Sequence, residues 1–140
     1  MPHPALPYVL LLKITLTFLL WALPLLFVPA WLADRLQLPF AQPEIFGRLL
    51  GAAYLALNLG YMLGYAEFSR GLVPTNAILV GILSNGLAAL LLLAFGAAGA
   101  YDGMHAPGQL LMWVSAAATT LITIGLLLTG FSAAVRALRK

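Results

Sequence analysis

Residues 45–66 read IFGRLLGAAYLALNLGYMLGYA, an apolar run with a single charged residue, Arg48, and no proline. As a helix with a rise of 1.5 Å per residue, a run of this length extends about 33 Å, which matches a hydrocarbon core about 30 Å thick. Pro43 and Glu44 stand directly before the run and suit the first turn of a helix. The run therefore predicts a membrane-spanning helix.

Three further apolar runs of similar length predict three more helices, so that the set covers residues 8–31, 45–66, 75–98 and 110–131. The 140 residues are 63% hydrophobic and only 8% charged, with a mean hydropathy of +1.01. Soluble domains have roughly 25% charged residues. The runs are too long for barrel strands, and their short connections favour antiparallel neighbours. The sequence thus predicts an all-α integral membrane four-helix bundle, up-down-up-down, as a single membrane domain over residues 1–140.

The first run carries Pro24 and Pro29 near its far end, where we expect a kink or an early stop. A signal peptide is the alternative interpretation, because residues 28–30 are suited to cleavage and the apolar stretch after Lys13 is short. At the end of the chain, residues 132–140 are expected to continue the fourth helix as a short amphipathic helix in the membrane interface.

The distribution of Lys and Arg predicts the orientation. With a cytoplasmic N-terminus, the inner side has five basic residues, Lys13, Arg70, Arg136, Arg139 and Lys140. The outer side has two, Arg35 and Arg48. Because cytoplasmic loops carry an excess of Lys and Arg, both termini are predicted to be cytoplasmic. Leu/Ala richness, with Arg preferred over Lys, points to a GC-rich bacterium and hence to the bacterial inner membrane.

Ionisable side chains are nearly absent from the apolar runs: Lys13 is the one clearly embedded residue, and no carboxylate accompanies it. Coupled transporters, proton relays and membrane hydrolases generally need such groups at depth, so an enzyme is the least favoured class. The chain has no cysteine, and His3 and His105 are expected on opposite sides of the membrane. The sequence therefore predicts no metal site, no cofactor and no nucleic-acid partner.

Lys13 has two interpretations. It lies about five residues into the first run, roughly 7 Å past its start, which is within reach of a lysine that snorkels back to the headgroups. We favour that interpretation from the sequence. The alternative is a cation that lines a cavity together with Thr17, one turn along the same face, and attracts an anion or a polar headgroup.

A polar stripe is predicted along one face of the second helix, where Tyr54, Asn58 and Tyr61 recur at helical spacing. Asn85 on the third helix and Thr119 on the fourth offer compatible polar groups to the same interior. The favoured interpretation is a packing seam in which each polar group bonds a neighbouring helix. The alternative is a cavity that binds a headgroup, a quinone or a small solute.

Four glycines of the second helix form two GxxxG spacings, Gly47 with Gly51 and Gly60 with Gly64. Such spacings let helix backbones approach closely, so these residues are predicted to mediate helix packing.

Arg48 lies one turn after Glu44, so the favoured interpretation is an ion pair between the two. Its alternative role is a guanidinium at the mouth of the polar stripe that binds a phosphate or carboxylate.

Residues 46–57, FGRLLGAAYLAL, resemble the Arg-x-x-Gly-x-x-Tyr/Phe-Leu opening of a helix in small bacterial four-helix membrane proteins of the DoxX-like kind and their uncharacterised relatives. The resemblance implies a similar size and helix number. The biochemical roles in that group are mostly undefined, so it implies no activity.

Two functions follow as hypotheses. The leading one is a non-enzymatic accessory or assembly subunit, which packs through its small-residue helix faces against a larger membrane complex or further copies of itself. The second is a small channel or carrier that binds a hydrophobic or anionic ligand in the polar interior. In both cases membrane lipids are expected partners.

Overall fold

The computed structural model describes residues 3–36, 38 and 44–139 of the chain. Within these residues there are helices, turns and loops but no strand. Four helical stretches are long and apolar enough to cross a membrane, namely Leu6–Phe27, Glu44–Ser69, Thr75–Ala97 and Ala106–Leu138. The four predicted helices are therefore confirmed as helices, with shifted ends.

The first stretch is not a uniform α-helix. It consists of α1 (Leu6–Thr17), a π-helical turn η1 (Phe18–Ala22) and α2 (Leu23–Phe27). Pro24 has no N–H, and its ring clashes with the carbonyl four residues back in a regular helix. The backbone widens just before it, so that the Leu23 N–H donates to the Phe18 carbonyl, five residues back. The expected kink near Pro24 is therefore a π turn.

The same stretch ends at Phe27, four residues earlier than predicted. Val28 is extended, with ψ of 121°, because a residue before proline is disfavoured in the helical region. After Pro29 a separate short helix, α3 (Ala30–Leu36), begins. The expectation of an early stop at the second proline is confirmed, whereas the predicted continuation to residue 31 is wrong.

The second and third stretches are the uninterrupted helices α4 (Glu44–Ser69) and α5 (Thr75–Ala97). Gly71, with φ of 79°, turns the chain between them. A β-carbon on Gly64 of α4 would lie 2.3 Å from that of Ala77 on α5, so the two backbones approach here as closely as glycine permits. This contact fixes where α4 and α5 cross.

The other glycines of α4 have different surroundings. A β-carbon on Gly51 would lie 2.9 Å from the β-carbon of Leu25, so Gly51 admits α2, and Gly47 is also buried. Gly60 is exposed, and nothing lies within 4 Å of where its β-carbon would be. The two GxxxG spacings thus serve packing within the chain at Gly51 and Gly64, but not at Gly60.

The last stretch consists of α6 (Ala106–Leu126), a second π turn η2 (Leu127–Phe131) and α7 (Ser132–Leu138). The backbone N–H of His3 donates to the Thr129 carbonyl over 2.9 Å, which ties the start of the chain to this turn. The expected helix after residue 132 is present as α7.

The loop between α5 and α6 is anchored by Tyr101. The Tyr101 hydroxyl donates to the Leu92 carbonyl over 2.6 Å, and its ring packs edge-on against Trp113 with centroids 5.4 Å apart. Burial raises the pKa of Tyr101 above its ordinary value, so the hydroxyl keeps the proton that it donates. The anchored loop fixes the C-terminal end of α5 and the N-terminal end of α6 relative to each other.

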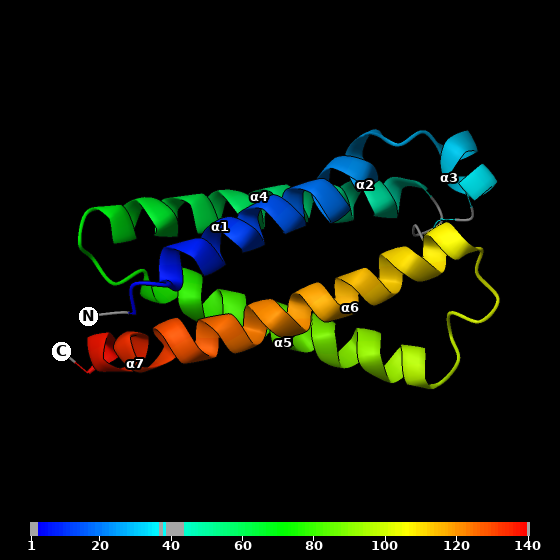
Figure 1. Ribbon diagram of the computed structural model, residues 1–140. Coiled ribbons are helices and arrows are strands. Elements are labelled where there is room, and N and C mark those ends of the chain that lie inside the picture. Colours follow the sequence, from blue (N-terminus) through cyan, green and yellow to red (C-terminus); the bar gives the residue numbers. More distant parts are fainter. Residues whose placement is uncertain (1–2, 37, 39–43, 140) are drawn as a thin grey trace.

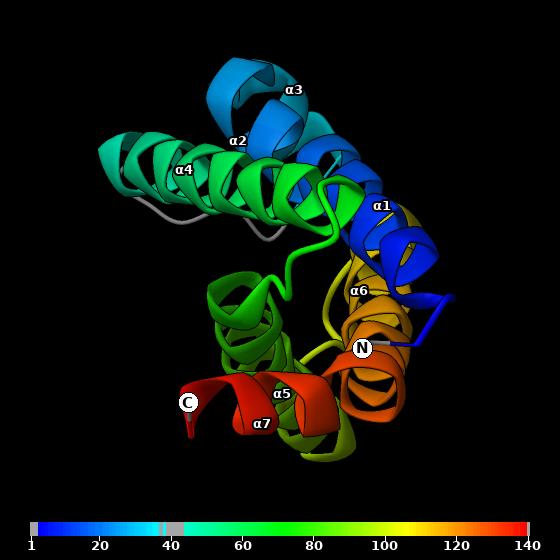
Figure 2. The ribbon, with the colours of Figure 1, turned by 90° about the vertical axis from the view of Figure 1, so that its left-hand side faces the viewer.

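Figure 1 shows both chain ends, the α4–α5 connection and α7 at one end of the molecule, with α3 and the α5–α6 loop at the other. Figure 2 shows α1 beside α4 and α5 beside α6. A cluster of fully buried apolar residues lies near the chain ends: Leu6, Leu10, Ile78, Ile122, Leu126 and Ala134. From there α5 is inclined away from α4, so the two helices separate toward α3 (Figure 1).

The outer surface of the helices is apolar. Leu59, Leu83, Leu90 and Leu121 are each more than half exposed. Soluble proteins rarely expose contiguous apolar surface on this scale, whereas a hydrocarbon environment suits it. The outward faces therefore agree with four helices surrounded by lipid.

Candidate ligand-binding cavity

A cavity of about 260 Å³ lies between the α1–α4 pair and the α5–α6 pair. Its polar lining includes Lys13, Tyr54, Tyr61, Ser84, Asn85 and Thr119. At 1.5 Å per residue, Lys13 is about 10 Å from the start of α1 and Tyr54 about 15 Å from the start of α4, so the cavity is deep within the helical stretches. Five of the seven predicted ligand-binding residues meet here.

Lys13 points into the bundle. The side chain is only 3% exposed, and its Nζ lies 4.0 Å from the centroid of the Tyr61 ring, a cation–π contact. The ion pair of the described residues joins Arg48 to Glu44, so no described carboxylate pairs with Lys13. The favoured snorkelling interpretation is therefore not what the structure shows: Lys13 is an interior cation with no counter-charge among the described residues.

Tyr61 is held in place from both sides. Its hydroxyl is 2.9 Å from the Ser84 hydroxyl of α5, a hydrogen bond that links α4 to α5, and the side chain is almost fully buried. Gly81 of α5 lies close by, with the Tyr61 ring and the Lys13 Cε at ordinary contact distance, 3.7 Å, from where its β-carbon would be. The ring that faces the ammonium is thus fixed before any ligand arrives.

Asn85 and Thr119 satisfy part of their hydrogen bonding within their own helices. The Asn85 amide donates to the Gly81 carbonyl over 2.7 Å, and the Thr119 hydroxyl donates to the Ser115 carbonyl over 2.8 Å. Such bonds to the preceding turn are common for short polar side chains. The predicted packing seam, in which each polar group bonds a neighbouring helix, therefore holds for Tyr61 with Ser84 but not for these two residues.

Aromatic rings line the cavity farther along the first span. Trp21 of η1 stacks on Tyr54 of α4 with ring centroids 5.9 Å apart. Thr17, one turn before Trp21, also lines the cavity, as expected for a residue on the face of Lys13. π turns recur at functional sites, and this one sets the direction of Trp21. Sequence reasoning missed Trp21, although Pro24 three residues later was a signal for the altered turn.

Asn58, a predicted site residue, is buried at 4% exposure but is not among the residues that line the cavity. Its Oδ1 has no hydrogen-bond partner, and the same is true of the Ser115 hydroxyl on α6. Buried polar atoms without a partner are rare and cost about 1–3 kcal/mol each. The interior around the cavity therefore contains polar atoms that no hydrogen bond between the helices accounts for.

Arg48, also a predicted site residue, lies outside the cavity. It pairs with Glu44 as predicted, and it also donates to the carbonyls of Leu25 (2.9 Å) and Val28 (3.0 Å). In a continuous helix the Leu25 carbonyl would accept from the N–H of residue 29, but that residue is a proline. Arg48 therefore donates hydrogen bonds to carbonyls that have no helical partner at the C-terminal end of α2. The sequence did not predict this role.

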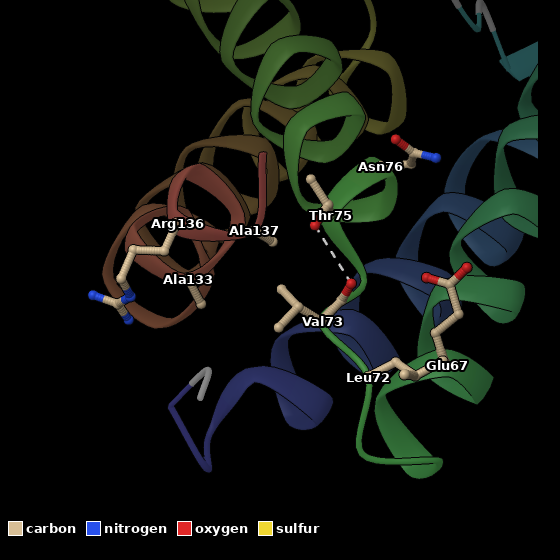
Figure 3. A pocket seen from close by; sticks show the side chains of 8 residues that line it. All are labelled: Glu67, Leu72, Val73, Thr75, Asn76, Ala133, Arg136 and Ala137. Atoms are coloured by element: carbon tan, nitrogen blue, oxygen red, sulfur yellow. Dashed lines mark hydrogen bonds between the residues drawn. The ribbon is translucent and has the colours of Figure 1, made fainter. Parts of the chain in front are cut away.

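A second, wider groove of about 550 Å³ lies near the chain ends, between the end of α4, the start of α5 and α7. Figure 3 shows Glu67 on one side and Arg136 on the other, with Arg136 pointing away from Glu67. Thr75 at the start of α5 bonds the Val73 carbonyl beside it. Because Arg136 is exposed and pairs with no carboxylate of the described residues, this groove has the character of a solvated surface.

The described residues contain no group of three or more His, Asp or Glu side chains placed to hold a metal ion. The four long apolar helices are compatible with a multi-pass α-helical membrane protein, and a polar cavity lies between them. Comparison with protein-family models, curated proteins and solved structures gave no match to this chain. The resemblance of residues 46–57 to DoxX-like proteins accordingly stays a prediction.

Proposed function

We propose that the protein binds an anionic ligand in the Lys13 cavity and acts as a non-enzymatic binding protein or carrier of a bacterial inner membrane. This is the second of the two hypotheses from the sequence. The observation that carries it is a buried cation with no described carboxylate to pair with it. A charge at this depth is costly unless it is neutralised or hydrogen bonded, and a bound anion would supply the missing charge.

The rest of the lining suits an anion too. Hydroxyl groups of Thr17, Tyr54 and Ser84 line the same cavity as the Lys13 ammonium, and all of them can donate hydrogen bonds. Charge-assisted hydrogen bonds to carboxylate or phosphate oxygens are among the strongest that side chains make. The same groups include no general base, which fits binding better than catalysis.

For the orientation, we propose that the end with both termini faces the cytoplasm. Of the described basic residues, Arg70, Arg136 and Arg139 lie at that end, and Arg35 and Arg48 lie at the other (Figure 1). The excess of basic residues at the first end is what the positive-inside rule requires of the cytoplasmic side.

The proposal is tested with the purified protein in lipid nanodiscs and hexadecanoate as the probe. Binding is followed by fluorescence, since Trp21 lines the cavity. Lys13→Met should weaken binding by about 10- to 100-fold, the equivalent of a lost charged hydrogen bond. Arg70→Met removes a cation at the membrane surface and serves as the matched control, with binding unchanged. Equal binding by wild type and Lys13→Met would contradict the proposal.

A second candidate is the accessory or assembly subunit. The observation that favours it is Gly60, an exposed glycine on α4 with open space in front of it, where another helix could approach closely. Under this alternative, cross-linking in native membranes should capture a second copy or another subunit at α4, and Gly60→Leu should abolish the cross-link.

A further inference from the structure

We propose that the ligand is a single-chain amphiphile, with a carboxylate or phosphate headgroup in the Lys13 cavity and its hydrocarbon chain in a groove on the outer side of α4 and α5. This inference rests on the proposed function and names the ligand class for the same site.

The groove has a volume of about 420 Å³ and an almost wholly apolar lining. On α4 it is lined by Ala53, Ala56 and Gly60, and on α5 by Ala77 and Val80, with Asn76 at the start of α5. Ala53 and Gly60 are separated by about 10 Å along the helix axis. The side chains here are small on α4 and short on α5, so they leave a trough. Most of the remaining outer surface carries the larger side chains of leucines.

The groove adjoins the polar cavity, because Leu57 and Tyr61 line both. One face of the Tyr61 ring lies against the Lys13 ammonium, and Leu57 stands one turn away on α4. These two side chains form the boundary between the polar and the apolar space. A chain attached to an anion at Lys13 can therefore pass Leu57 directly into the groove.

The sizes of the two spaces support this division. A cavity of about 260 Å³ is below the range of roughly 300–1,000 Å³ typical of sites that enclose a whole ligand. It accommodates a headgroup, and a long chain needs space beyond it. A second apolar groove, of about 260 Å³, meets the cavity at Leu91 and Leu92. The groove between α4 and α5 is the larger of these two, and we assign the single hydrocarbon chain to it.

The hydrocarbon chain of the ligand gains little hydrophobic free energy when it leaves lipid for the groove, because both surroundings are apolar. A comparison of probes that differ only in chain length would therefore report their partitioning into the bilayer. A substitution that blocks the groove, compared with wild type in the same lipid, separates occupancy of the groove from that partitioning.

Gly60→Leu is the blocking variant, since its side chain enters the groove while its β-carbon meets no atom within 4 Å. The matched control is Ala52→Leu, which adds a similar bulk at another exposed position of α4 that lines neither space. Binding of hexadecanoate, hexadecyl phosphate and butanoate is measured for each protein in nanodiscs. Thermal unfolding of each variant checks that the fold is retained.

Gly60→Leu should weaken binding of both 16-carbon probes by about tenfold, consistent with overpacking of a fitted site, and leave butanoate binding unchanged. The stronger 16-carbon probe identifies the headgroup. Unchanged binding of all probes by Gly60→Leu would overturn the inference while leaving the Lys13 site intact. Binding that is lost in Lys13→Met but unchanged in Gly60→Leu would likewise overturn the inference about the groove and leave the Lys13 site intact. Absence of any binding by wild type would overturn the proposed function itself.

Discussion

The two glycines of one GxxxG spacing are predicted to respond oppositely to the same substitution. An added methyl group on Gly64 would lie 2.3 Å from the Ala77 β-carbon, whereas on Gly60 it would meet nothing within 4 Å. Apolar carbons in contact are about 3.5–4.0 Å apart. Gly64→Ala therefore requires α4 and α5 to separate by more than 1 Å at their crossing.

Overpacking of this kind costs about 1–3 kcal/mol, partly offset by about 1 kcal/mol from the higher helix propensity of alanine. We therefore expect Gly64→Ala to lower the free energy of unfolding by about 1–2 kcal/mol. Gly60→Ala should be neutral or slightly stabilising. The difference also reaches the Lys13 cavity, because the crossing at Gly64 lies on the same helices as Tyr61 and Ser84.

The assay is reversible denaturation in mixed detergent micelles, followed by circular dichroism at equal protein concentration. Gly64→Ala combined with Ala77→Gly should recover most of the lost stability, since the second change removes the atom that clashes. Equal loss at both glycines, or a larger loss at Gly60, would refute the reasoning and indicate that the outer face of α4 is a packed interface. A double variant no more stable than Gly64→Ala would refute the assigned contact.

Three further substitutions probe single contacts. Arg48→Met removes the donors to the Leu25 and Val28 carbonyls and should lower the free energy of unfolding by about 1–3 kcal/mol, whereas Glu44→Gln, which removes only a surface ion pair, should change it by less than about 1 kcal/mol in the same denaturation assay. Tyr61→Phe keeps the ring against Lys13 but loses the bond to Ser84, so it should cost about 1 kcal/mol of stability and reduce anion binding less than Tyr61→Leu, as measured by probe titration. Tyr101→Phe removes the hydrogen bond to the Leu92 carbonyl and should cost about 1 kcal/mol, with faster amide hydrogen exchange confined to the α5–α6 loop and the adjoining helix ends.

Hydropathy and helical periodicity were sufficient to predict the four helices and most of the cavity lining. Tyr54 and Tyr61 share one face of α4, and a polar face of a membrane helix has to turn inward, so the meeting of these residues with Asn85 and Thr119 followed from the pattern. The direction of Lys13 did not. A lysine about 10 Å from a helix start can extend outward or inward, and Tyr61 on another helix decides between the two.

The roles of Arg48 and Gly60 also depended on tertiary contacts. Arg48 was assigned to Glu44 by spacing alone, because the unpaired carbonyls it reaches belong to a helix 20 or more residues away in sequence. Gly60 and Gly64 have the same local spacing, and only the inclination of α5 leaves one buried and the other exposed (Figure 1). Spacing identifies which residues share a helix face, but the neighbouring helices determine what that face contacts.

Native mass spectrometry of the protein extracted gently from its own membrane tests the central claim most directly. The account predicts that wild type carries one anionic amphiphile per chain, and that Lys13→Met, folded equally well, carries none. A wild-type particle with no bound anion, or a bound molecule retained equally by Lys13→Met, would contradict the claim that the buried lysine exists to hold a ligand.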